Sequence, residues 1–388
     1  MADFRDLSGK FALVGVAESD ELGTLPHKSA LQLHAEAARN AIADAGLNKN
    51  DIDGVFSAGR LFATETAEYL GLRPRYIDGT MVGGCSFLLH VQHAMAAINA
   101  GLCEVALVTH GESGRSRVAM PSLSSPKDSL LWQFEIPYGI IAPFTGYGFV
   151  ATRHMHEFGT TQEQLAEVAV ATRAWARLNP KANQRGPLSV ADVMKSPIIS
   201  WPFHVLDCCL VNDGGGACIV TSAERAKNLK KKPVYILGTG EGTAHCSVNQ
   251  MPDFTTATGA AISGKQAFAM AGVTPKDIDV AMFYDAFTIV PILALEDLGF
   301  CKKGEGGAFV SGQRTAPGGE FPMNTNGGGL SYAHTGMYGM FIIIEAVRQI
   351  RGECGERQVK DAEVAICHAP GGIFSAMSTM IVANAPRA

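Results

Sequence analysis

Apolar and polar positions in the first third of this chain follow two periods, one typical of buried strands and one typical of helices. The run KFALVGVAES (10–19) is apolar almost throughout and predicts a strand, as do DGVFSAG (53–59) and VALVTHG (105–111). In SALQLHAEAARNAIADAG (29–46) the apolar residues recur at helical spacing and a glycine ends the pattern, which predicts an amphipathic helix. A more apolar helix is predicted over 85–101. Alternating strands and helices indicate a layered α/β architecture.

The pattern occurs a second time farther along the chain. AGLNKNDIDGVFSAG (45–59) and AGVTPKDIDVAMFYD (271–285) both indicate the end of a helix, a short acidic turn and a strand. An apolar helix and a strand then recur in each copy, beginning at Cys85 in the first and at His334 in the second. Two halves related by a pseudo-twofold axis are therefore expected, with these two residues at equivalent helix N-termini near its centre. A thiol and an imidazole that meet there can act as nucleophile and base.

Between the two copies the regular pattern is interrupted. Prolines recur between residues 111 and 201, around a helical stretch, TQEQLAEVAVATRAWARLN (161–179). This interval predicts an inserted loop domain that covers a binding site. The next run, LVNDGGGACIVTS (210–222), predicts a glycine-rich turn that leads into a buried strand. The expected division is an N-terminal half (1–115 and 205–225), a loop domain (116–204) and a C-terminal half (226–388).

Composition indicates a chain that buries a large core and has no general affinity for polyanions. The 388 residues are 47% hydrophobic and 18% charged, which is typical of a globular protein long enough for two domains. The net charge of −5 excludes a general attraction to nucleic acid or to an anionic membrane, although a local basic patch could hold a phosphorylated ligand. The polybasic run from Lys230 to Lys232 is interpreted as a solvated lead-in to a strand.

The location expected for the protein is the cytoplasm. The first residues lack the basic segment, the continuous apolar segment and the small-residue cleavage site of a secretory signal. Each apolar stretch is too short, or too interrupted by glycine and polar residues, to span a bilayer. Nine cysteines without the dense spacing of a disulfide scaffold fit a reducing compartment and leave room for a reactive thiol.

Cys85 and His334 suit covalent catalysis. A thiol at a helix N-terminus faces the positive end of the helix dipole and free backbone N–H groups, which favour the thiolate and are expected to lower its pKa. His334 could accept the thiol proton. The glycines and Tyr332 that precede His334 predict a close approach of the backbone to a ligand, so Gly328 and Tyr332 are candidate substrate or oxyanion contacts.

Four motifs, in this order along the chain, resemble those of the thiolase superfamily, and in particular its sterol-carrier-protein-type thiolases and thiolase-like lipid-transfer enzymes. Cys85 in GGCSFLLHVQHAMAAINAG lies where that family has its nucleophile, and His334 in NTNGGGLSYAHTG lies on its histidine. YDAF (284–287) corresponds to the NEAF or HDCF loop, and CHAPGG (367–372) to the CxGGG or HNIG loop. The resemblance covers essentially the whole chain and implies a five-layered αβαβα fold of two duplicated halves with an inserted loop domain.

For function, the resemblance implies a thiolase-type acyl-CoA C-acyltransferase. Cys85 would form an acyl-enzyme with His334 as its base, and the N–H groups of Cys85 and of the Gly371-Gly372 loop would form a second oxyanion hole. Coenzyme A or acyl-CoA would be a substrate, with no permanently bound cofactor. The resemblance also implies a homodimer and a small OB-fold partner protein with a zinc ribbon.

The chain departs from the family motifs at several positions. Thr335 stands where the family usually has proline, and Tyr284 and Ala286 replace the polar residues of NEAF and HDCF. Thiolysis requires a second acid/base group. The alignment assigns this role to His368, with Tyr284 as the other candidate and Asp285 beside it shaping the site.

A retro-aldolase is the main alternative, because some thiolase-like lipid-transfer enzymes are aldolases that cleave a β-hydroxyacyl-CoA and are thought to use tyrosines instead of the cysteine. Tyr284, Tyr332 and Tyr338 are the candidates. A phenol with its ordinary pKa of ~10 is a poor base at neutral pH, so it would need a lowered pKa or a partner such as Asp285 or His334. A third hypothesis is a thiolase fold that has lost its chemistry and serves as a lipid-binding subunit.

A metal site is not expected. His204 and Asp207-Cys208-Cys209 place metal-binding side chains together, but adjacent cysteines lack the CxxC spacing and no second pair follows at a usual distance. Contacts to the phosphates of coenzyme A are expected from a small group of arginines: Arg115, Arg117, Arg153 and Arg185.

Overall fold

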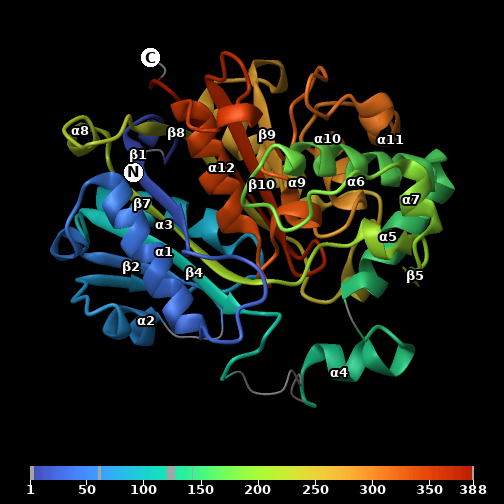
Figure 1. The fold of residues 1–388 in the computed structure, drawn as a ribbon, viewed down its shortest axis with the longest axis horizontal. Coiled ribbons are helices and arrows are strands. Elements are labelled where there is room, and N and C mark those ends of the chain that lie inside the picture. Colours follow the sequence, from blue (N-terminus) through green and yellow to red (C-terminus); the bar gives the residue numbers. More distant parts are fainter. Residues whose placement is uncertain (1–3, 60–62, 120–126, 142, 387–388) are drawn as a thin grey trace.

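The strands of the two halves meet edge to edge in a computed structural model that describes residues 4–59, 63–119, 127–141 and 143–386 (Figure 1). They are β1 (Phe11–Glu18), β2 (Gly54–Ser57), β3 (Tyr76–Asp78), β4 (Val105–Ser113), β7 (Asp213–Ser222), β8 (Val234–Thr243), β9 (Val280–Phe283), β10 (Val364–Gly371) and β11 (Ala376–Ala383). Their order is β3-β2-β4-β7-β1-β8-β11-β10-β9, so each half supplies one side. β1 and β8 join through only Ala12 with Tyr235 and Leu13 with Val234. The arrangement is therefore two sheets with a narrow junction.

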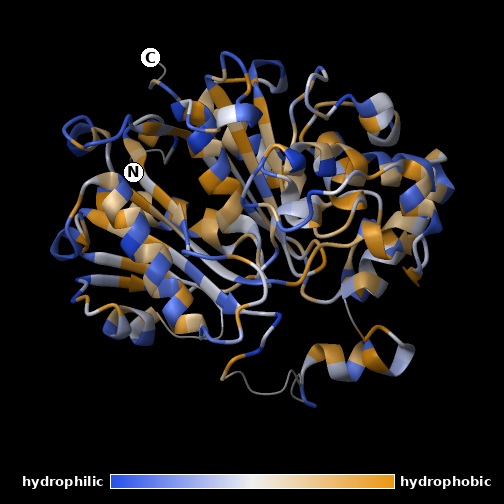
Figure 2. Cartoon of the chain, in the orientation of Figure 1, coloured by the Kyte–Doolittle hydropathy of each residue, from blue (hydrophilic) through white to orange (hydrophobic). Residues whose placement is uncertain are grey.

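Helices form three layers around these sheets. α3 (Ser86–Asn99) and α12 (Gly339–Arg351) lie between the sheets, since each contacts strands of both halves. α1 (Ala30–Ala45) covers the outer face of the first sheet and α9 (Thr258–Ala271) that of the second. Nearly all of α12 is buried, whereas α1 buries one face and shows alternating hydrophilic and hydrophobic positions in Figure 2. The predicted αβαβα sandwich is confirmed.

The interval between β4 and β7 consists mostly of helices. α5 (Pro143–Phe158) packs against α10 (Ile289–Asp297), and α6 (Gln162–Arg177), which confirms the helix predicted over 161–179, packs against α11 (Gly306–Val310). α4 (Leu130–Phe134) lies at the lower right of Figure 1. The remaining elements are α2 (Ala63–Tyr69), α7 (Val190–Lys195), α8 (Ala223–Ala226), β5 (Ile198–Ser200) and β6 (Phe203–His204).

The duplicated sequence folds in the same way in both halves. α1 and α9 each end at a glycine in the left-handed conformation, Gly46 with φ 72° and Gly272 with φ 63°. A short 3₁₀ turn follows in each copy, and its aspartate, Asp51 or Asp277, accepts a hydrogen bond from a backbone N–H at the start of the turn. The strand β2 or β9 then begins. The same local interactions therefore produce the repeat that the sequence predicts.

Two local predictions are wrong. The glycines at 214–216 do not form a turn before the strand but lie within β7, where a Cβ on Gly215 would be 2.8 Å from the carbonyl oxygen of Leu33 in α1. His334 does not open a helix, because α12 begins at Gly339 with Tyr338 as its N-cap. The residue that corresponds in position to Cys85, the N-cap of α3, is therefore Tyr338.

The described residues contain no disulfide, and all nine cysteines are free. This agrees with the prediction that the chain has no disulfide framework. None of the helices in the described ranges combines the length and the apolar character needed to cross a bilayer.

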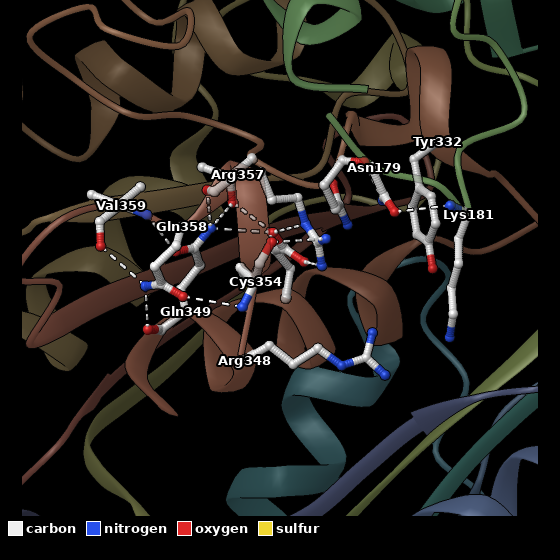
Figure 3. A network of polar contacts seen from close by, with 12 residues as sticks. Asn179, Lys181, Tyr332, Arg348, Gln349, Cys354, Arg357, Gln358 and Val359 are labelled. Carbon is white, nitrogen blue, oxygen red and sulfur yellow. Dashed lines mark hydrogen bonds and ion pairs between the residues drawn. The ribbon is translucent and has the colours of Figure 1, made fainter. Parts of the chain in front are cut away.

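A buried ion network connects both halves with the interval between them. The carboxylate of Glu18, at the end of β1, accepts hydrogen bonds from Arg348 of α12 (2.7 Å), from Lys181 (2.9 Å) and from the Tyr332 hydroxyl (2.8 Å). Figure 3 shows the side chains of Arg348, Lys181 and Tyr332, together with a second polar network at the C-terminal end of α12. Burial opposes ionisation of Glu18, but the charges of Arg348 and Lys181 outweigh it and hold its pKa well below the usual range.

We expect Glu18→Gln to lower the free energy of unfolding at pH 7 by about 3 kcal/mol, because the substitution leaves Arg348 buried without its counter-charge. The folded-state pKa is depressed, so this stabilisation is fully present above the unfolded value of 4.5 and is lost as the pH falls below it. Wild type should therefore lose more stability than the variant between about pH 5 and about pH 3. Scanning calorimetry across this range measures both effects.

The control is Glu21→Gln, which removes an exposed partner of Lys28. It should change the unfolding free energy by less than about 1 kcal/mol. Equal effects of the two substitutions would show that the Glu18 network does not stabilise the fold.

Candidate functional site

An apolar cavity of about 630 Å³ lies where the two halves meet the interval between β4 and β7. Its larger apolar lining residues are Phe144 and Tyr147 of α5, Ile199 of β5, Phe287, Met337 and Ile373. Its lining groups that can exchange a proton include Tyr284, His334, Cys208 and Cys209. An apolar space with a few titratable groups is typical of a site for a small-molecule ligand.

A hydrogen bond between Tyr284 and His334 is the main polar interaction at this cavity. The Tyr284 hydroxyl lies 2.7 Å from Nε2 of His334, and both side chains are buried. Burial lowers the pKa of His334 to about 4 and raises the pKa of Tyr284 well above 10. At neutral pH both groups are therefore uncharged. In the tautomer protonated at Nδ1, the imidazole accepts the phenol proton.

Cys85 occupies the predicted position but not the predicted environment. It is the N-cap of α3 and is 0% exposed, and its thiol points toward the carbonyl oxygen of Ala376 at 3.6 Å. Burial raises the pKa of Cys85 to about 12. The expectation of a lowered pKa is therefore wrong, because desolvation of the thiolate outweighs the backbone N–H that favours it.

The ring of Tyr284 packs beside the start of α3, where Gly83 and Gly84 also line the cavity. It packs on Gly84, the residue before Cys85, so closely that a Cβ on Gly84 would lie 2.1 Å from the ring. Gly371 lies against the thiol itself, since a Cβ there would be 2.9 Å from Sγ of Cys85. Cys85 does not line the cavity. Among the predicted residues, the structure thus brings Tyr284 and His334 together in the cavity, whereas Cys85 is buried one residue after the lining residue Gly84.

A segment that the sequence analysis did not assign to the site, Asp207–Asn212, holds its two sides together. Thr288 donates to the Asp207 carboxylate (3.0 Å), and the Cys209 N–H donates to the carbonyl of Ala286 (2.9 Å). Farther along, the Leu210 N–H donates to Gly329 O at 2.9 Å.

The last residue of this segment, Asn212, fixes the backbone of His334. Its N–H donates to His334 O at 3.0 Å and its side-chain oxygen accepts the His334 N–H at 3.1 Å. Thr335, which replaces the usual proline, hydrogen-bonds through its hydroxyl to His110 at 2.8 Å. The sequence signal in this segment is the pair of adjacent cysteines, Cys208 and Cys209. As a metal motif the pair lacks the CxxC spacing, and its place beside the ligand cavity is visible only in the structure.

Asp285 supports the glycine-rich loop and does not face the ligand space. Its carboxylate accepts the N–H of Gly329 at 2.6 Å, and a Cβ on Gly328 would lie 2.0 Å from its Oδ2. Burial raises the pKa of Asp285 to about 7, although these backbone donors oppose the shift. Asp285 was predicted to shape the site, and it holds the glycine-rich loop by these contacts. The glycines allow its carboxylate to approach the backbone.

Two predicted ligand contacts are directed elsewhere. The Gly328 N–H donates to the side chain of Asn326 at 2.9 Å, so it is not available to an oxyanion. The Tyr332 hydroxyl is bound to Glu18. Tyr338 lies closer to the site, with its ring 5.5 Å from that of Tyr284 and its hydroxyl donating to Asn326. Gly372 lines the cavity, whereas Gly371 contacts Cys85.

His368 lies on the opposite face of the sheet from the cavity. Its Nδ1 bonds to Thr379 at 2.8 Å, and Thr379 in turn bonds to Ser263 of the outer helix α9. Cys367, one residue earlier, faces the inner helix α12. Because side chains alternate along a strand, the two cannot face the same layer. The structure therefore does not bring His368 to Cys85 or His334.

No group of side chains suited to a metal ion occurs within the described ranges. His204 and Asp207 instead form a local turn, in which the Asp207 carboxylate accepts the His204 N–H. Of the candidate arginines, Arg153 lines a second cavity of about 700 Å³ beside Phe149 and Trp201.

Sequence comparisons find relatives across nearly the whole chain. Residues 240–384 match the family model "Thiolase C-terminal domain-like". The chain is 35% identical to 17-hydroxy-3-oxo-4-pregnene-20-carboxyl-CoA lyase of Mycobacterium tuberculosis, over 89% of this chain and 92% of that protein. It is 32% identical to acetyl-CoA acetyltransferase of Methanothermobacter thermautotrophicus, over 93% of this chain and 96% of that protein. It is 28% identical to sterol carrier protein 2 of Oryctolagus cuniculus, over 97% of this chain and 72% of that protein.

Structural comparison gives the same result. The solved structure of the Ltp2-ChsH2(DUF35) aldolase superposes with a TM-score of 0.91 and 33% sequence identity, and the match covers 98% of this chain and 99% of that one. The resemblance stated from the four motifs is thereby confirmed.

We expect Cys85 to resist alkylation at pH 7, because its thiol is buried and protonated. Tyr284→Ala should increase its rate of reaction with iodoacetamide by roughly 10-fold or more, by removing the ring that covers Gly84. Mass spectrometry of tryptic peptides measures the rate. The exposed Cys246 should react equally fast in both proteins. Rapid alkylation of Cys85 in the wild type would contradict the burial argument.

Proposed function

The chain belongs to the thiolase superfamily, in its sterol-carrier-protein-type branch, and from this premise we propose that it is a carbon–carbon lyase that cleaves a β-hydroxyacyl-CoA by a retro-aldol reaction. The observation that carries the proposal is the buried hydrogen bond between Tyr284 and His334 at the cavity, which the buried Cys85 does not line. One relative is a lyase and the similar structure is an aldolase, which supports the same choice.

The chemistry begins with proton removal from the β-hydroxyl of the substrate. A phenol with a raised pKa is a weak base alone, but Tyr284 can take the substrate proton while passing its own to Nε2 of His334. The bond between the α- and β-carbons then breaks, the β-carbon becomes a ketone, and the electron pair remains on the acyl-CoA as an enolate. Protonation of the α-carbon completes the reaction, so no oxidant or reductant is needed.

The surroundings of the pair suit this step. Tyr284 and His334 are both buried, so a proton transfer between them is shielded from bulk water. The His334 backbone is fixed by Asn212 on both its N–H and its carbonyl. Such a fixed acceptor keeps the imidazole aligned with the tyrosine hydroxyl. In this scheme the reacting groups start neutral, and no thiolate nucleophile is needed.

A thiolase-type acyltransferase is the second candidate. Two observations favour it: Cys85 lies at the N-terminus of α3, and an acetyl-CoA acetyltransferase is 32% identical to this chain. Cys85 is fully buried and does not line the cavity, so its surroundings would have to move before its thiol could reach a thioester. His368 cannot supply the second acid/base of that mechanism without a change of sheet face.

The ligand and partners proposed follow from the family. Coenzyme A would be part of the substrate, with Arg153 beside Phe149 and Trp201 as the candidate phosphate contact. The similar structure carries two names, Ltp2 and ChsH2(DUF35), and supports the proposal that a small partner protein binds this chain. The predicted OB-fold with a zinc ribbon and the homodimer remain proposals.

The decisive test compares Tyr284→Phe with Cys85→Ala on 17-hydroxy-3-oxo-4-pregnene-20-carboxyl-CoA and on simpler tertiary β-hydroxyacyl-CoA thioesters. We expect Tyr284→Phe to reduce kcat by roughly 100-fold or more, because it removes the proton acceptor. Cys85→Ala should retain cleavage within roughly 3-fold. Release of the ketone and of the shorter acyl-CoA is measured by liquid chromatography and mass spectrometry.

The opposite pattern, in which Cys85→Ala loses activity and Tyr284→Phe keeps it, would favour the acyltransferase over the lyase. In that case wild type incubated with acetyl-CoA would gain an acyl group that Cys85→Ala lacks, as seen in the intact mass. Thermal unfolding of both variants is the folding control.

The pH profile gives an independent prediction. His334 must be neutral to accept a proton, and burial lowers its pKa to about 4. The acid limb of kcat/KM should therefore lie near pH 4, well below the value of ~6.5 for an ordinary histidine. Activity recovered after return to pH 7 separates titration from unfolding. A reversible limb near pH 6.5 would contradict the assignment.

A further inference from the structure

We infer that Cys209 is a further catalytic residue of this site, whose thiol delivers the proton to the α-carbon of the acyl-CoA enolate. The inference rests on the proposed retro-aldol function. It names the acid for the second half of that reaction, which Tyr284 and His334 leave open.

The backbone places Cys209 between the two motifs of the site. Its N–H donates to the carbonyl of Ala286 in YDAF at 2.9 Å, and the next residue, Leu210, donates to Gly329 of the glycine-rich loop. Cys208 forms a bridge with Phe287 at the same place. Cys209 thus lies beside Ala286, the position at which the HDCF form of this loop carries its own cysteine. A thiol from a different segment of the chain occupies the neighbourhood of the one that YDAF lacks.

Cys209 lies at the cavity that holds the reacting groups. It lines the same cavity as Tyr284 and His334. After burial, Cys209 also contributes to the raised pKa of Tyr284. Burial raises the pKa of Cys209 itself, so its thiol keeps the proton that it would donate.

Other proton donors at the cavity are committed elsewhere. The Tyr147 hydroxyl donates to Gly372 O at 2.7 Å, and the Cys208 thiol donates to His204 O at 3.4 Å. Among the described residues, the Cys209 thiol donates no hydrogen bond. Of the two cysteines in the pair, Cys209 is therefore the one that is free to serve a substrate atom.

The proton balance closes with this assignment. When the bond between the α- and β-carbons breaks, the Cys209 S–H bond breaks and a new C–H bond forms at the α-carbon. The thiolate then regains a proton from the Tyr284–His334 pair, which holds the one taken from the substrate hydroxyl. Every group returns to its starting state, and the products are a ketone and the shortened acyl-CoA.

Two reactions of the full-length protein test the inference. The first is ketone release from 17-hydroxy-3-oxo-4-pregnene-20-carboxyl-CoA, and the second is deuterium exchange into the α-carbon of propionyl-CoA in D₂O, with and without a 17-ketosteroid. We expect Cys209→Ala to slow both by roughly 100-fold and Cys209→Ser to be intermediate. Cys301→Ala is the matched control, a partly exposed thiol away from the cavity, and should stay within roughly 2-fold of wild type.

Each outcome has one interpretation. Exchange and cleavage by Cys209→Ala within roughly 3-fold of wild type would overturn the role of Cys209 and leave the lyase intact. Exchange that depends on Cys209, without ketone release by wild type, would keep its acid/base role and overturn the lyase. Wild type that neither cleaves nor exchanges would overturn both. Circular dichroism reports folding, and the closely isosteric Cys209→Ser decides if the alanine variant does not fold.

Discussion

The site depends on one close approach, between the N-terminal ends of the two inner helices. A Cβ on Gly339, the first residue of α12, would lie 2.2 Å from the carbonyl oxygen of Gly84, just before α3. Side chains at these positions would force the helices apart and with them the two sheets that they separate. Because the helices begin against each other, the loops that lead into them from both halves converge. Tyr284 and His334 meet there.

Burial at this convergence decides the electrostatics. A helix dipole stabilises a charge at its N-terminus by ~0.3–1 kcal/mol, whereas an unpaired charge taken from water into a protein interior loses several kcal/mol. The second effect dominates for Cys85, Tyr284 and His334, each of which is held in its neutral form at pH 7. Proton transfer between neutral hydrogen-bonded groups therefore suits this interior better than a stable thiolate. Glu18 shows the contrasting case, in which two cations keep a buried carboxylate ionised.

The segment from Asp207 to Asn212 gives the convergence its rigidity. It leaves the interval after β4, passes beside YDAF and the glycine-rich loop, and enters β7 of the N-terminal half. Asn212 fixes the His334 backbone, and Cys209 contributes to the cavity. One strand-like segment thus couples the position of the proton acceptor to the shape of the ligand space. Changes in this segment are expected to affect geometry as well as chemistry.

The sequence by itself determined the duplicated helix–turn–strand units, the layered α/β class and the identity of Cys85, His334 and Tyr284 as site candidates. These follow from local periodicity, from glycine at helix ends and from short motifs, all of which act over a few neighbouring residues. Only the tertiary structure decided that Tyr284 covers Gly84, that His368 faces the outer helix and that Tyr332 binds Glu18. Side-chain direction and burial depend on which segments pack together, and contacts such as Cys209 with Ala286 join residues far apart along the chain. A motif therefore locates a reactive group, and packing decides what that group can reach and in which charge state.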